Sequence, residues 1–126
     1  MDKTALVEAY INDGKKLIET LVKAQFPIKA ALWFYMTDAE EWRLLIASPI
    51  VEEKGPNEAY TLIQKELEQL SLDISLNEVS VLSPRSELIR LIRATIKTGT
   101  KIAGIRFTGN VIQNKLIEDA YIYLVI

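Results

Sequence analysis

The chain of 126 residues contains no cysteine and no histidine. Without cysteine, disulfide bonds, thiolate nucleophiles and cysteine-ligated metal sites are excluded. Without histidine, the commonest general base and the commonest transition-metal ligand are missing as well. Any catalytic site would therefore have to use carboxylates, lysines or hydroxyl groups.

Long apolar runs are also missing, because no stretch reaches the roughly 18 to 20 residues that span a bilayer. The first residues, "MDKTALVEAY", lack the apolar segment of a signal peptide. The composition, with 49% hydrophobic and 25% charged residues, is ordinary for a globular protein. We therefore expect a cytoplasmic protein without a membrane segment, folded as one globular domain over residues 1–126.

Hydrophobic periodicity predicts three helices, and runs of apolar residues predict five strands. The expected helices cover 4–24, 55–70 and 84–99, and the expected strands cover 28–37, 42–48, 78–83, 101–107 and 116–126. The stretch 28–37 is apolar on both faces, which favours a central strand. The fold class predicted from this order, α-β-β-α-β-α-β-β, is α+β, with an antiparallel hairpin at each end and a mixed sheet of about five strands packed with helices.

Several residues mark the ends of these helices. Asp2 or Thr4 is expected to cap the first helix, whereas Ser83, Pro84 and Gly99 are expected to delimit the third. Gly14 falls within the apolar face of the first helix, where glycine costs about 1 kcal/mol relative to alanine. We therefore expect close packing of another backbone segment against it.

The segment "SPIVEEKGPNEAY" contains Glu52 and Lys54 in an E-x-K arrangement downstream of Asp38. In one class of metal-dependent nucleases, such residues hold Mg²⁺ and support the nucleophile. Here about ten residues of extended chain, roughly 30 Å at 3.3 Å per residue, separate Asp38 from Glu52. We therefore interpret the segment as a charged loop and keep a nuclease as the weakest hypothesis.

No other combination of residues points to catalysis or to a bound cofactor. The sequence contains no phosphate-binding glycine motif, no nucleophile elbow and no calcium-loop spacing. The acidic pair Glu118 and Asp119 is consecutive, so on a strand the two carboxylates face opposite sides. The sequence thus predicts no catalytic residues, no metal site and no cofactor, and leans towards a protein that is not an enzyme.

Charge is unevenly distributed along the chain. Residues 1–82 hold 8 Lys/Arg and 14 Asp/Glu, whereas residues 83–126 hold 7 and 3, respectively. On the third predicted helix, a polar stripe lies opposite the apolar face formed by Leu88, Ile92 and Ile96. We predict an anion-binding site on this stripe, formed by Arg85, Ser86, Arg90, Arg93 and Lys97. The alternative is that these residues are the ordinary solvated face of a helix.

The last predicted strand, "AYIYLVI", is strongly apolar on both faces. At the edge of the sheet it would pair with another chain, and Tyr121, Tyr123 and Val125 would form the interface. The alternative is a central strand whose tyrosines line the core. Trp33 and Trp42 are expected in the core.

Taken together, these features favour a non-catalytic protein-interaction module, acting as an adaptor or inhibitor, that self-associates into a homo-oligomer or binds an acidic protein partner. An anion or nucleic-acid backbone binder that uses the basic stripe is the alternative. The overall net charge of −2 argues against nucleic acid, because dedicated binders are usually basic.

Overall fold

The computed structural model describes residues 5–126, and it confirms the predicted α+β fold with a five-stranded mixed sheet. The helices are α1 (Glu8–Lys23), α2 (Ile50–Glu53), α3 (Pro56–Glu68), the single 3₁₀ turn η1 (Leu76–Glu78) and α4 (Glu87–Thr95). The strands are β1 (Ala30–Met36), β2 (Glu41–Ala47), β3 (Val79–Leu82), β4 (Ile105–Ile112) and β5 (Lys115–Val125).

The strands lie in the order β3-β2-β1-β5-β4. The two predicted hairpins, β1–β2 and β4–β5, are confirmed as antiparallel pairs. β2 and β3 run parallel, which requires the crossover that α2 and α3 provide. β1 is the central strand, as its apolar sequence predicts, because side chains on both of its faces are buried.

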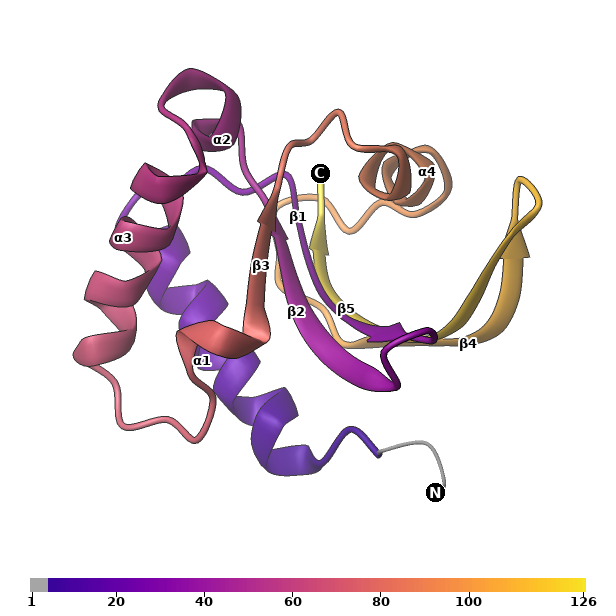
Figure 1. The fold of residues 1–126 in the computed structure, drawn as a ribbon, viewed down its shortest axis with the longest axis horizontal. Coiled ribbons are helices and arrows are strands. Elements are labelled where there is room, and N and C mark those ends of the chain that lie inside the picture. Colours follow the sequence, from indigo (N-terminus) through magenta and orange to yellow (C-terminus); the bar gives the residue numbers. More distant parts are fainter. Residues whose placement is uncertain (1–4) are drawn as a thin grey trace.

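The two faces of the sheet carry different helices (Figure 1). α1 and α3 pack against one face, where Leu17, Leu21 and Ile63 belong to the same buried cluster as Trp33. α4 packs against the other face, where Ile89 and Ile92 are buried. Figure 1 shows the sheet curling around α4, so that the β4–β5 hairpin rises beside this helix.

Gly14 lies where α1 crosses two buried aromatic side chains, not a second backbone segment as the sequence suggested. A Cβ atom at this position would lie 2.4 Å from Tyr123 Oη and 2.7 Å from Trp33 Nε1. The absence of a side chain therefore allows α1 to approach the sheet. Tyr10, one turn earlier in α1, stacks on the Trp33 ring with centroids 5.8 Å apart.

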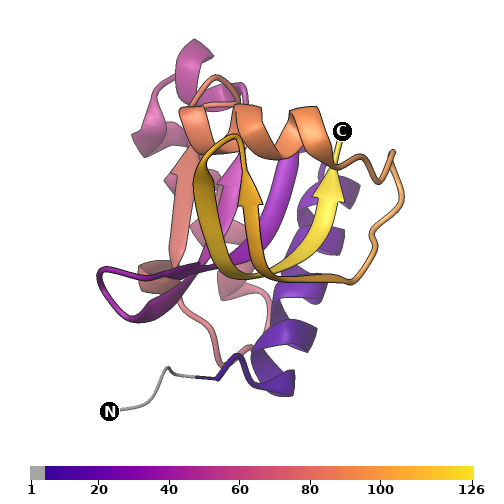
Figure 2. The same ribbon diagram turned by 90° about the vertical axis from the view of Figure 1, so that its right-hand side faces the viewer.

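The β4–β5 hairpin changes the phase of its side-chain alternation halfway along. Phe107 and Ile112 both pack on the α4 side of the sheet. In a regularly alternating strand, an odd-numbered and an even-numbered residue would lie on opposite faces. Between them, Gly109 has a φ of 61°, which the absence of a side chain makes accessible. The hairpin therefore bends at Gly109, and Figure 2 shows it curving towards α4.

Some predicted boundaries are wrong. α4 begins after Ser86 rather than Ser83 and ends at Thr95, so Lys97 and Gly99 lie beyond it. The helix stops there because Thr98 leaves the helical path to bind Val125. The Thr98 N–H donates to the Val125 carbonyl at 2.9 Å, and the Val125 N–H donates to the Thr98 hydroxyl at 2.9 Å.

Two other segments differ from the prediction. The charged segment after β2 is not entirely a loop, because α2 forms one helical turn there. β4 extends to Ile112, through residues expected to connect two strands. The caps predicted at Asp2 and Thr4 lie outside the described residues, and Val7 precedes the first residue of α1. Within residues 5–126, no helix has the length and apolar character needed to cross a membrane.

Candidate interaction site

The residues of the predicted anion-binding stripe follow α4 but have separate partners. The exposed Arg85 pairs with Glu52 of α2 at 3.5 Å. Arg93 donates a hydrogen bond from Nε to the main-chain oxygen of Ile126 at 2.8 Å. Two of the predicted cations therefore hold neighbouring parts of the chain, and Lys97 lies beyond the helix.

Arg90 is exposed and borders an open groove of about 400 Å³ between α4 and the β4–β5 turn. Glu87, Leu91, Ala94 and Gln113 complete the lining. Because a carboxylate lies beside the arginine, this groove has no strong preference for an anion. Ser86, at the N-terminus of α4, makes no capping hydrogen bond, and its hydroxyl is buried.

The E-x-K residues do not meet the acid with which they would form a nuclease site. Asp38 lies in the turn between β1 and β2, whereas Glu52 lies in α2, beyond the other end of β2. Seven residues of β2 separate the two ends, which corresponds to roughly 23 Å. Among residues 5–126, no three acidic side chains gather as a metal site.

The terminal strand, β5, lies inside the sheet between β1 and β4 rather than at its edge. Tyr123 is 1% exposed, accepts a hydrogen bond from Trp33 Nε1 at 3.0 Å and donates one to the carbonyl of Ile11. Burial raises the pKa of the Tyr123 hydroxyl well above its usual value. Val125 is also fully buried, and Tyr121 is half-buried. The predicted interface would require exposed side chains at Tyr123 and Val125, whereas both are buried.

Exposed apolar side chains are found instead on the β4–β5 hairpin. Val111 and Leu116 are 66% and 57% exposed, and they face each other as a cross-strand pair. Ile105, at the start of β4, is also exposed. This pair was not predicted from the sequence because Gly109 and Asn110 resemble turn residues. The true turn is Gln113–Asn114, whose positive φ values of 47° and 68° suit a two-residue hairpin.

The outer side of β4 is an edge of the sheet, with no strand beside it among the described residues. Natural edge strands are usually short, or protected by proline or by a charged side chain. β4 is eight residues long, contains no proline and carries one charged residue, Arg106.

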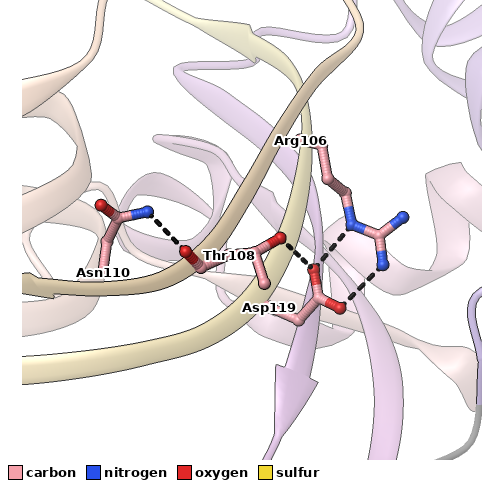
Figure 3. A network of polar contacts seen from close by, with 4 residues as sticks. All are labelled: Arg106, Thr108, Asn110 and Asp119. Carbon is pink, nitrogen blue, oxygen red and sulfur yellow. Dashed lines mark hydrogen bonds and ion pairs between the residues drawn. The ribbon is translucent and has the colours of Figure 1, made fainter.

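The Arg106 side chain is already bound to its own hairpin (Figure 3). Its Nε and Nη2 donate hydrogen bonds of 2.7 Å to the two carboxylate oxygens of Asp119, whose side chain is only 4% exposed. Thr108 donates a weaker hydrogen bond to the same carboxylate at 3.4 Å. The guanidinium also lies 5.6 Å from the centre of the Trp42 ring. The one charge on β4 is therefore directed into the protein's own surface rather than towards the open edge.

Comparisons with known proteins give no guide to this site. No protein-family model, no curated protein and no solved structure matches the chain.

Proposed function

We propose that this chain is a non-catalytic protein-interaction module that self-associates through the β4–β5 hairpin. The observation that carries the proposal is the open edge of β4 beside the exposed pair Val111 and Leu116. Removing these two side chains from water would contribute roughly 1 to 2 kcal/mol each. The non-catalytic part of the proposal depends on the absence of histidine and cysteine.

The test is molar mass by light scattering, measured over a wide range of protein concentration and at low and high salt. We expect a dimer that forms with increasing concentration and is insensitive to salt, because apolar contacts are not screened. Val111→Asp should shift the population towards the monomer. Val22→Asp is the matched control, since Val22 is another exposed valine, on α1 and away from the hairpin. A monomer at every concentration would contradict the proposal.

An acidic protein partner is the second candidate, supported by two exposed cations, Arg90 on α4 and Lys97 just after its end. Such binding should weaken steeply with salt, whereas hairpin-mediated association should not. Pull-down of the wild type and of Arg90→Glu at two salt concentrations separates the two mechanisms. We keep the cytoplasm as the expected compartment on the sequence argument alone, and microscopy of a tagged chain would check it.

A further inference from the structure

We infer that the partner at this site is a second copy of the chain, and that the two β4 strands pair antiparallel about a two-fold axis between Thr108 and Gly109. This inference builds on the proposed function and specifies its geometry. The outcome would be a continuous ten-stranded sheet across two chains. Three features of β4 support this pairing: its open edge, the phase change at Gly109 and the position of its single charge, Arg106.

The register follows from the phase change. On β4, side chains before Gly109 alternate in one phase and those after it in the other, because Phe107 and Ile112 share the α4 side. In antiparallel pairing about an axis normal to the sheet, residues opposite each other must point to the same face. For two residues on either side of Gly109, this condition holds only when their residue numbers add up to an odd total. The total of 217, which places Ile105 opposite Ile112 and Thr108 opposite Gly109, is the one that pairs the whole strand.

In that register, the two exposed apolar residues of β4, Ile105 and Val111, each gain a neighbour from the second copy. Ile105, whose cross-strand partner Ile122 lies on the α4 side, would face Ile112 of the second copy. Val111 would lie opposite Arg106 of the second copy, while Leu116 on β5 would remain its neighbour on the inner side of β4. Because both bends are at Gly109, they would coincide in this register, and the curvature that Figure 2 shows for one hairpin would be matched by the other.

Electrostatics permit the same arrangement. Like charges directly opposite each other destabilise a strand pair. The two Arg106 residues would be separated by five residues along the strand, or about 18 Å. Each guanidinium is also held by its own Asp119. The contact therefore places no unpaired charge at its centre.

Because the natural chain has no cysteine, single introduced thiols give a clean test of the register. In the register that places Ile105 opposite Ile112, the two Thr108 Cα atoms would lie about 6 Å apart and the two Val111 Cα atoms about 18 Å apart. A disulfide requires Cα atoms within about 7 Å of each other. Thr108→Cys should therefore form a disulfide-linked dimer on mild oxidation, whereas Val111→Cys should not. Both side chains are exposed on the same strand, so each variant controls for the other.

A spin label at Gln113→Cys supplies an independent distance, expected at about 30 Å between the two Cα positions. Circular dichroism would check that each variant remains folded. If light scattering shows a dimer but Val111→Cys cross-links as readily as Thr108→Cys, the inferred pairing is overturned while self-association stands. If the unmodified chain is a monomer throughout, the proposed function itself fails, and with it this inference.

Discussion

Replacement of Gly14 by alanine sets two effects of opposite sign against each other. In a solvent-exposed helix interior, alanine is more stable than glycine by about 1 kcal/mol. Here the new methyl group would lie 2.4 Å from Tyr123 Oη and 2.7 Å from Trp33 Nε1, well inside van der Waals contact. Both aromatic residues are fully buried, so neither ring can swing into solvent to make room.

The clash should decide the outcome. Overpacking a core typically costs about 1 to 3 kcal/mol. Displacing the ring that carries the Tyr123 hydroxyl would also strain or break its 3.0 Å hydrogen bond from Trp33, and an unsatisfied buried group costs a further 1 to 3 kcal/mol or so. Against the helical gain, we expect a net loss of roughly 1 to 5 kcal/mol in the free energy of unfolding.

Urea denaturation followed by tryptophan fluorescence measures this loss as a lower transition midpoint. Asn12→Ala, at an exposed position of the same helix, is the control and should raise stability by several tenths of a kcal/mol. In a Tyr123→Phe background, the nearest clashing atom is absent, so the cost of Gly14→Ala should shrink. A Gly14→Ala chain as stable as the wild type would refute the close approach of α1 to these rings.

The remaining predictions concern single side chains. Burial raises the pKa of the Tyr123 hydroxyl above the unfolded value of about 10. Its contribution to stability is therefore complete below about pH 10 and is lost as the pH rises further. In urea titrations between roughly pH 9 and 11, Tyr123→Phe should lose less stability than the wild type. Arg93→Ala should lower the free energy of unfolding by about 1.5 to 3 kcal/mol, because it removes a charged hydrogen bond to Ile126. Arg90→Ala, on the exposed side of α4, should change the free energy of unfolding by less than about 0.5 kcal/mol. Equal effects of the two substitutions would contradict the different roles assigned to the two arginines. Arg106→Ala should cost about 2 kcal/mol in thermal unfolding because it leaves a desolvated carboxylate, and Arg106→Lys should recover only part of that.

The central part of the fold was predictable because its pattern has few alternative explanations. A strand such as β1, apolar on both faces, can only be covered on both sides, and the structure places it in the middle of the sheet. Both hairpins also followed from short connections between apolar runs. In contrast, the end of α4 depends on hydrogen bonds exchanged between Thr98 and Val125, a partner 27 residues away that local propensity cannot reveal.

The candidate site was harder to predict, for a related reason. The basic residues of α4 lie on one helix, but Arg85 and Arg93 bind side-chain and main-chain groups of distant segments. The open edge of β4 was obscured because Gly109 and Asn110 look like turn residues when read alone. An available signal was Gln113–Asn114 between "VI" and "KL", since asparagine readily adopts the positive φ that two-residue hairpins require.

The central pairing of β1 with β5 also has a consequence for synthesis of the protein on the ribosome. The partners of β1 residues on β5, such as Val125 for Ala30, are made about 90 residues later, which corresponds to roughly 4 to 18 s of translation. Until then, one side of the most apolar strand has no partner. A chain with such non-local contacts completes its core only after β5 is available. Nascent chains of this protein should therefore be bound by chaperones that recognise exposed aromatic segments around Trp33.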